Sequence, residues 1–261
     1  MCFAYDATPP DPPNTGALGA DSGTASGEDI VLTAADGIQF AAYVSRPGAP
    51  NGAGIVILPD VRGLFRFYKE LADRFAVAGV EAIAIDYFGR TAGLTPRDES
   101  FDYMPHVQQT QASQVAQDVA AAITYLKGHV VPVPRAIFTV GFCFGGTQSL
   151  VQDANHHGLA GVIGFYGPPT TARAGGPSVV DRISEFECPV LAFYGGQDQA
   201  IPPEAIQTFE QALTNANVPH EIVVYPDAPH SFFDRRMTEY QADSADAWQR
   251  MLAFIGRLTP A

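Results

Sequence analysis

The sequence AIFTVGFCFGGTQSL, residues 136–150, is the strongest structural signal in the chain. Residues 137–140 are β-branched and aromatic, as in a buried strand, and a glycine-rich turn and residues that can begin a helix follow them. A strand, a sharp turn and a helix in this order form a nucleophile elbow, with Cys143 in the nucleophile's place. Gly141 and Gly145 flank Cys143, and their missing side chains let such a turn close.

The place of Cys143 at the start of a helix also has a chemical meaning. Backbone N–H groups without helical acceptors and the positive end of the helix dipole favour a thiolate over a thiol there. The thiolate is the form that attacks carbonyl carbon. The alternative is a glycine-bearing turn that buries an inert cysteine, because cysteine is often an ordinary core residue.

Strand and helix patterns alternate along most of the chain. A hairpin is expected where two β-type runs meet at Asp36-Gly37. Further strands are expected at residues 53–59, 80–88, 137–140, 161–166, 190–194 and 221–225, and helices at 67–77, 107–126, 145–155, 203–216 and 240–258. This alternation predicts an α/β fold with a mostly parallel sheet, helices on both of its faces and an antiparallel hairpin near the N-terminus.

The sequence divides into an N-terminal arm and one domain. Residues 1–28 are rich in Pro, Gly, Ala and Thr without apolar periodicity, which predicts an extended or poorly ordered arm. Residues 29–261 are long enough for one large α/β domain.

Composition limits the classes of function. Of the 261 residues, 46% are hydrophobic and 16% charged, as in a globular protein with a sizeable core. The net charge of −13 opposes binding to nucleic acid or to an anionic membrane surface. Three cysteines without paired spacing favour a reducing compartment, and neither a membrane span nor a signal peptide is recognisable, so the cytoplasm is expected. No metal-ligand spacing and no dinucleotide or phosphate motif occurs, so no metal or cofactor is expected.

Two further reactive residues follow strand ends, where parallel sheets collect their catalytic groups. Asp198 follows the strand expected at 190–194, and His230 follows the strand expected at 221–225. The chain order of Cys143, Asp198 and His230 is the order of an α/β-hydrolase triad. Taken singly, Asp198 is equally compatible with a turn residue and His230 with an exposed loop residue.

The three residue types form a working set for acyl transfer. His230 takes the thiol proton, Asp198 orients the imidazole, and backbone N–H groups stabilise the oxyanion that forms on the carbonyl oxygen. The N–H groups of Val61 and Phe144 are the expected oxyanion donors in an α/β-hydrolase fold.

The chain resembles the dienelactone hydrolase family of α/β-hydrolases, also called carboxymethylenebutenolidase-like. The resemblance covers residue 30 to the C-terminus. It rests on the cysteine elbow GFCFGG at 141–146, the acid loop GGQD at 195–198 and the histidine loop PHSF at 229–232. It implies a hydrolase that opens lactones or related esters through a cysteine, without metal or cofactor.

The resemblance also implies roles at other positions. Asp60 stands where the family has a glutamate that contacts the resting thiol, and Arg90 matches an arginine that grips a substrate carboxylate. The place of a second such arginine is held by Asp234, and Arg235 or Arg236 would have to substitute for it.

Arginines are concentrated near the expected site although the chain is acidic overall. Arg62, Arg90, Arg235 and Arg236 are expected beside the loops that rim it, which favours an anionic substrate. The alternative is that these arginines pair with neighbouring acids. The expected apolar walls of the pocket are Tyr87, Phe88, Tyr166 and Phe232, unless these are ordinary core residues.

The sequence therefore predicts a carboxylic ester hydrolase acting on a small-molecule lactone or activated ester. The alternatives are a broader carboxylester or thioester hydrolase on the same fold, and a ligand-binding member without catalysis. The oligomeric state, monomer or dimer, stays open.

Overall fold

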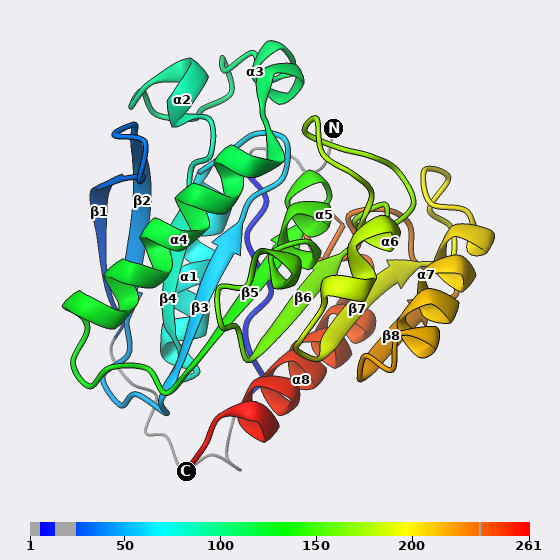
Figure 1. The fold of residues 1–261 in the computed structure, drawn as a ribbon. Helices are drawn as coiled ribbons and strands as arrows, with labels where there is room; N and C mark the ends of the chain where they lie inside the picture. Colours follow the sequence, from blue (N-terminus) through cyan, green and yellow to red (C-terminus); the bar gives the residue numbers. More distant parts are fainter. Residues whose placement is uncertain (1–5, 14–24, 235) are drawn as a thin grey trace.

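An eight-stranded sheet forms the centre of the computed structural model, which describes residues 6–13, 25–234 and 236–261 (Figure 1). The strands lie in the order β1-β2-β4-β3-β5-β6-β7-β8. The pairs β1/β2 and β2/β4 are antiparallel, and the other pairs are parallel. The expected mostly parallel sheet with an antiparallel N-terminal hairpin is confirmed. The strands are β1 (Ser26–Thr33), β2 (Gln39–Arg46), β3 (Ala53–Leu58), β4 (Glu81–Ile85), β5 (Ala136–Phe142), β6 (Gly161–Phe165), β7 (Val190–Gly195) and β8 (His220–Tyr225).

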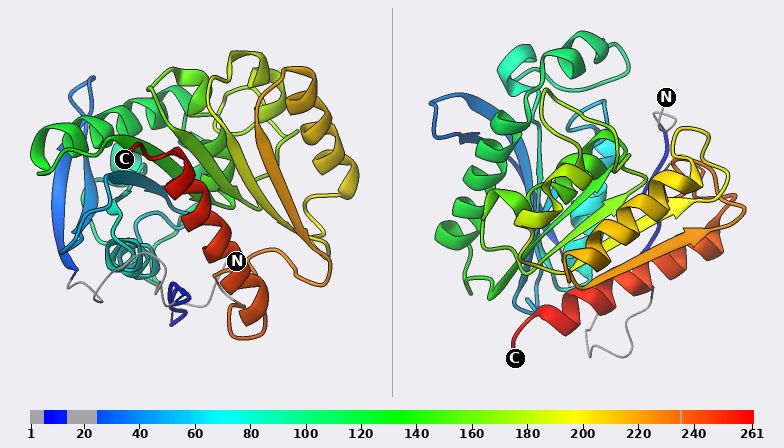
Figure 2. Two further views of the ribbon diagram at one scale, coloured as in Figure 1. Left: turned by 90° about the horizontal axis from the view of Figure 1, so that it is seen from below. Right: turned by 45° about the vertical axis from the view of Figure 1, so that its right-hand side comes forward.

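Helices cover both faces of this sheet, as Figure 2 shows from below. Helices α1 and α8 share one face, where the rings of Phe75 and Trp248 lie 4.7 Å apart between centroids. Helices α4 and α7 lie on the other face. The helices are α1 (Arg66–Val77), α2 (Gly89–Ala92), α3 (Met104–Gln109), α4 (Ala112–His129), α5 (Phe144–Leu150), α6 (Val179–Arg182), α7 (Pro203–Asn215) and α8 (Gln241–Leu258).

The composition of the central strands explains their position. Every residue of β3, β4, β5, β6 and β7 is buried, as expected for apolar strands covered by helices on both faces. Alternate residues of β3 pack against different helices: Ile55 and Ile57 belong to the core cluster with α1, whereas Val56 belongs to the cluster with α4. This two-sided burial fixes the register of the sheet and therefore the position of each strand end.

Several element boundaries differ from the expected ones. The helix expected at 107–126 is two helices, α3 and α4, because Thr110 is extended with φ −65° and ψ 136°. The Thr110 hydroxyl donates to the carbonyl of His106 at 2.8 Å, and the Ala112 N–H donates to the carbonyl of Ala174 at 2.6 Å. These contacts end one helix and begin the next. The helix expected to reach residue 155 ends at Leu150, with a separate 3-10 turn at Asp153–Asn155.

The described part of the N-terminal arm, residues 6–13, lies against α1 and α8. The indole N–H of Trp248 donates to the carbonyl of Pro10 at 2.9 Å, and Arg74 forms an ion pair with Asp11 at 2.7 Å. The first strand begins at Ser26, three residues before the expected domain start at residue 29. Within the described ranges, no helix combines the length and the apolar character needed to cross a membrane.

Candidate active site

The turn after β5 holds Cys143 in a strained backbone conformation. Its φ of 54° and ψ of −113° are rare for a residue with a side chain, and α5 begins at the next residue. Two glycines make the turn possible, because a Cβ on Gly141 would lie 1.9 Å from the carbonyl oxygen of Gly145, and one on Gly145 would lie 2.1 Å from that of Pro59. The turn therefore has the geometry that the sequence predicts for a nucleophile elbow.

Hydrogen bonds from the backbone of Cys143 fix this turn to its neighbours. The Cys143 N–H donates to the carbonyl of Phe165 at the end of β6, at 3.0 Å. Its own carbonyl accepts from the N–H of Thr147 at 3.3 Å, which begins the helical pattern of α5. The side chain is half-buried. The sulfur thus sits on a rigid support at the carboxyl edge of the sheet.

Asp198 and His230, which lie 32 residues apart in sequence, meet at the carboxyl ends of β7 and β8. His230 Nδ1 lies 2.6 Å from Asp198 Oδ2. The other carboxylate oxygen, Oδ1, accepts from the N–H of Ala200 at 2.9 Å. The Asp198 side chain is 1% exposed and that of His230 27% exposed. Because an ionised carboxylate only accepts, Nδ1 carries the proton of this bond, and Nε2 is the nitrogen that can exchange a proton elsewhere.

Parallel strands bring these residues to one edge. Strands β5, β6, β7 and β8 are neighbours and run parallel to one another. Cys143 follows β5, Asp198 follows β7 and His230 follows β8. Residues that are far apart in sequence therefore share one end of the sheet, as predicted from the strand ends.

Tyr166 connects the elbow side of this edge to the histidine loop. Its ring lies 4.9 Å from the His230 ring between centroids and 5.7 Å from that of Phe232. Its hydroxyl donates to Asp234 at 2.9 Å. Tyr166, Phe232 and Asp234 are all buried. Asp234, which takes the place of an expected arginine, is thus a hydrogen-bond acceptor inside the protein.

The loop after β3 carries Asp60 and Val61. Asp60 is fully buried, and its Oδ1 accepts from the N–H of Arg62 at 2.9 Å. Its Oδ2 lies 3.4 Å from the Arg62 guanidinium. Tyr87, one of the expected pocket walls, is buried and donates its hydroxyl to the Asp60 carbonyl at 2.7 Å. Val61, which lies between Asp60 and Arg62 in the chain, is half-buried.

Comparison with known proteins places this architecture in a family. The sequence pattern that describes the dienelactone hydrolase family matches residues 40–259. The chain belongs to the dienelactone hydrolase family. The resemblance drawn from the three sequence motifs is confirmed, and with it the expectation of a carboxylic ester hydrolase of this type.

Individual family members show how far the similarity extends. A protein of Salmonella typhimurium assigned as a carboxymethylenebutenolidase is 32% identical, over 87% of this chain and 86% of its own length. A Bradyrhizobium protein assigned as a 2-oxo-3-(5-oxofuran-2-ylidene)propanoate lactonase is 25% identical, over 87% of this chain and 93% of its own. A crystal structure from Klebsiella pneumoniae, assigned as a dienelactone hydrolase, superposes with a TM-score of 0.76. It is 28% identical and covers 89% of this chain and 98% of its own.

Arg90, which the resemblance predicts to bind a substrate carboxylate, contacts carboxylates of the protein itself. Arg90 is the second residue of α2, and its side chain is 7% exposed. Its guanidinium forms ion pairs with Asp36 in the β1–β2 turn and, at 2.8 Å, with Asp118 of α4. Its predicted contact with a substrate carboxylate stays untested.

The other two candidate arginines lie in the histidine loop. Arg236 pairs with Glu239 and stacks over the ring of Tyr240, 5.3 Å from its centroid. Arg235 lies outside the described residues.

Two buried ion pairs, Arg90 with Asp118 and Arg97 with Asp86, were not predicted from the sequence. Asp118 lies among Val115, Val119 and Ala122 on the buried face of α4, and burial raises its pKa to about 7. A carboxylate on an apolar helix face was the available signal, since a buried charge requires a partner. Arg97 pairs with Asp86 at 2.8 Å, both 1% exposed, and no sequence pattern links them. In the part of the chain that the structure describes, no cluster of His, Cys, Asp or Glu side chains is arranged for a metal ion.

Proposed function

We propose that this chain hydrolyses a lactone or an activated ester through a covalent thioester on Cys143. The observation that carries the proposal is the 2.6 Å contact between His230 and the buried carboxylate of Asp198, at the same sheet edge as the cysteine elbow. Such a pair turns an imidazole into an oriented base. The half-buried thiol of Cys143 stands on a strained turn, which is an arrangement typical of nucleophilic catalysis.

The reaction would proceed in two balanced steps. His230 Nε2 takes the proton from the Cys143 thiol, and the sulfur attacks the carbonyl carbon. The tetrahedral intermediate then expels the alcohol or enolate, which takes the proton back from the imidazolium. Water, deprotonated by the same imidazole, then attacks the thioester carbonyl. The second tetrahedral intermediate expels the Cys143 thiolate, which takes the proton back from the imidazolium as the acid is released. No cofactor is needed for these steps.

The negative charge on the carbonyl oxygen needs hydrogen-bond donors. Phe144 is the first residue of α5, so its N–H has no acceptor within the helix. Val61 follows Asp60, whose N–H donates to the Tyr68 hydroxyl and whose carbonyl accepts from the Tyr87 hydroxyl, so this loop is held in place. We assign the two N–H groups to the oxyanion because Val61 lies in the loop after β3 and Phe144 directly follows Cys143 after β5, at the carboxyl ends of neighbouring parallel strands.

The chemistry of sulfur limits the substrate. In the tetrahedral intermediate a thiolate leaves more readily than an ordinary alkoxide or an amine. Cysteine catalysis therefore suits esters whose alcohol part is a stabilised enolate or a phenolate, and it disfavours peptides. The lactonase assignment of the Bradyrhizobium relative supports a lactone.

Replacement of Cys143 tests the mechanism. Cys143→Ala should lower kcat for p-nitrophenyl esters and enol lactones by roughly 10⁴-fold or more. A brief reaction of the wild-type chain, stopped with acid, should show by mass spectrometry one acyl group on the peptide that contains Cys143. Cys188→Ala is the matched control, because Cys188 is a buried core residue whose thiol pKa is raised by burial. Hydrolysis that survives Cys143→Ala would refute the mechanism.

A broader carboxylester hydrolase is the second candidate, and the ion pairs of Arg90 favour it. An arginine that already contacts two carboxylates does not by itself select an anionic substrate. A stoichiometric acyl-cysteine without turnover would instead indicate a ligand-binding protein.

A further inference from the structure

We propose that Tyr166 is a positioning residue that holds the imidazole of His230, and that Asp234 acts through Tyr166. The inference rests on the proposed function and deepens it, because it adds two residues to those that orient the base. Asp198 contacts the imidazole at Nδ1, and the ring of Tyr166 contacts it at a second place.

The ring of Tyr166 packs against the ring of His230. Their centroids lie 4.9 Å apart, and the two ring planes are tilted by 53°. One hydrogen bond at Nδ1 still allows an imidazole to pivot, and an aromatic ring packed against it in a defined orientation opposes that motion. Tyr166 is fully buried, whereas the His230 side chain is 27% exposed. The buried tyrosine is therefore a fixed surface for the more exposed imidazole.

Backbone hydrogen bonds hold Tyr166 and the elbow to the same strand ends. Tyr166 directly follows β6, and its N–H donates to the carbonyl of Phe193 in β7 at 2.7 Å. The preceding residue, Phe165, accepts the N–H of Cys143 at 3.0 Å. Tyr166 therefore has a fixed position relative to the turn that carries the thiol.

The side chain of Tyr166 is held by Asp234. Its hydroxyl donates to Oδ2 of Asp234 at 2.9 Å, and Asp234 is 1% exposed. A carboxylate oxygen accepts such a bond more strongly than a neutral oxygen does. Because Asp234 lies four residues after His230, the histidine loop carries both the imidazole and the acceptor that holds the tyrosine beside it. The loop therefore contacts Tyr166 at two points.

Backbone strain is concentrated around this arrangement. Six of the described residues other than glycine have a positive φ, and three of them are Cys143 at 54°, Tyr166 at 38° and Ser231, next to His230, at 62°. Such conformations are costly for residues with side chains and persist only where the surroundings determine them, often at functional sites. The strain therefore supports a fixed geometry for the tyrosine and the histidine loop.

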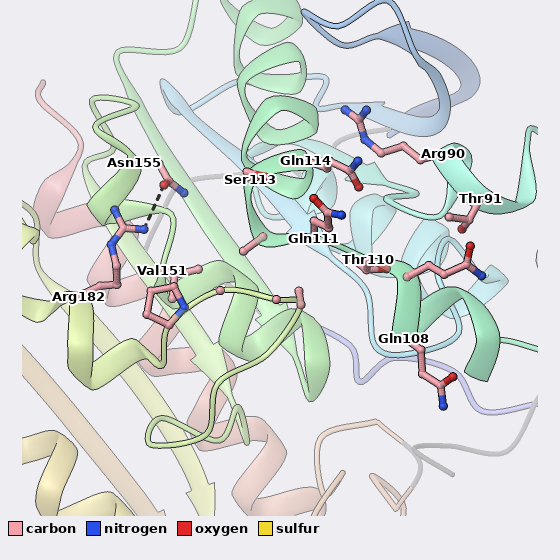
Figure 3. A pocket seen from close by; sticks show the side chains of 16 residues that line it. Arg90, Thr91, Gln108, Thr110, Gln111, Ser113, Gln114, Val151, Asn155 and Arg182 are labelled. Carbon is pink, nitrogen blue, oxygen red and sulfur yellow. Dashed lines mark hydrogen bonds between the residues drawn. The ribbon is translucent and has the colours of Figure 1, made fainter.

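The cavity of about 850 Å³ beside α4 lies on other elements (Figure 3). Its described lining comes mainly from α2, α3 and α4 and from the loop that precedes α6, and it does not include Cys143, His230 or Tyr166. Gln111, whose side chain Figure 3 shows in this lining, is exposed. It therefore provides a control for effects that do not pass through the imidazole.

Steady-state hydrolysis of p-nitrophenyl acetate by the full chain tests the proposal. In Tyr166→Phe and in Asp234→Ala we expect kcat to fall by about 5- to 20-fold, with KM within about 2-fold of wild type. The imidazole is the base in both steps, so kcat reports on it whichever step is slower. Because the two substitutions break the same hydrogen bond, the double variant should lose no more than either single variant, within about 2-fold. Asp234→Asn keeps an acceptor for the hydroxyl, so its kcat should stay within about 3-fold of wild type.

Tyr225→Phe is the matched control. The Tyr225 hydroxyl donates to Asp246 of α8 at 2.8 Å, so the substitution removes the same kind of hydrogen bond at the end of a neighbouring strand. Tyr225→Phe and Gln111→Ala should both keep kcat within about 2-fold of wild type.

The outcomes separate this inference from the mechanism. Wild-type kcat in Tyr166→Phe, additive losses in the double variant, or an equal loss in Tyr225→Phe or Gln111→Ala would overturn the positioning role and leave the cysteine mechanism intact. A higher KM with unchanged kcat would also overturn it, because Tyr166 would then bind substrate. If Asp234→Ala does not fold, Tyr166→Phe and Asp234→Asn still decide. Hydrolysis that persists in Cys143→Ala would overturn the mechanism itself.

Discussion

Two pairings of carboxylates with basic side chains, Asp198 with His230 and Asp36 and Asp118 with Arg90, differ in burial and in the number of carboxylates. Asp198 contacts Nδ1 of His230, whose side chain is 27% exposed. Asp36 and Asp118 contact both terminal nitrogens of Arg90, whose side chain is 7% exposed. We propose that the first pairing orients a base, whereas the second engages both terminal nitrogens of an arginine. Exposure and burial, rather than residue type, distinguish the two pairings.

The largest effect is expected at the first pair. Asp198→Asn keeps the shape of the side chain but removes its charge and can stabilise the wrong tautomer of His230. We expect kcat to fall by about 10² to 10⁴-fold in steady-state ester hydrolysis, with little change in KM. Unchanged thermal unfolding would show that the loss is chemical. A loss below about 5-fold would mean that Asp198 does not orient the base.

The ion pair between Arg90 and Asp118 should contribute to the free energy of unfolding. Arg90→Met leaves Asp118 as a buried carboxylate without its cation, so the free energy of unfolding should fall by roughly 3–5 kcal/mol in urea titrations. Arg66→Met is the matched control. Its ion pair with Glu70 is a surface i,i+4 pair with Arg66 62% exposed, and its loss should cost under about 0.5 kcal/mol. Equal losses in both variants would show that burial does not distinguish the Arg90 pairs.

The buried carboxyl group of Glu81 allows the effect of burial on stability to be tested by varying the pH. Burial raises the pKa of Glu81 to about 7, against an ordinary value of 4.5. Between these pH values the native chain binds more protons at this group than the unfolded chain, so Glu81 destabilises the fold increasingly as pH rises. Glu81→Gln should be more stable than wild type by roughly 1–2 kcal/mol at pH 8 and similar to it at pH 4.5. Urea titrations at both pH values measure this difference, and a constant difference would contradict the assignment.

The smallest effect is expected at Asp36, the more exposed of the two carboxylates that pair with Arg90. Asp36→Asn keeps the turn acceptor for the Ile38 N–H but removes the charge that faces Arg90. Because the Asp36 side chain is 34% exposed and Asp118 still compensates Arg90, Tm should fall by less than about 2 °C in calorimetry. A larger fall than that of Asp118→Asn would reverse the order of importance of the two carboxylates.

Much of the fold was readable from local patterns because those patterns have local causes. Apolar runs such as residues 53–58 must be covered on both faces, and the glycines around Cys143 permit a turn that bulkier residues forbid. The break at Thr110 was not readable, since it depends on the carbonyl of Ala174, which lies far along the chain. The contact of Pro10 with Trp248 depends likewise on residues 238 positions apart.

The sequence by itself determined the order of strands and helices, the elbow and the three candidate catalytic residues, because these follow from side-chain size, periodicity and the place of each residue after a strand. Only the tertiary structure decided which charges are satisfied. Asp198 contacts Nδ1 of His230 from 32 positions away, and Arg90 contacts two carboxylates, from residues 54 and 28 positions away. The physical reason is that the value of a charge depends on the burial and the partners that folding brings to it, and neither is written in its neighbours along the chain.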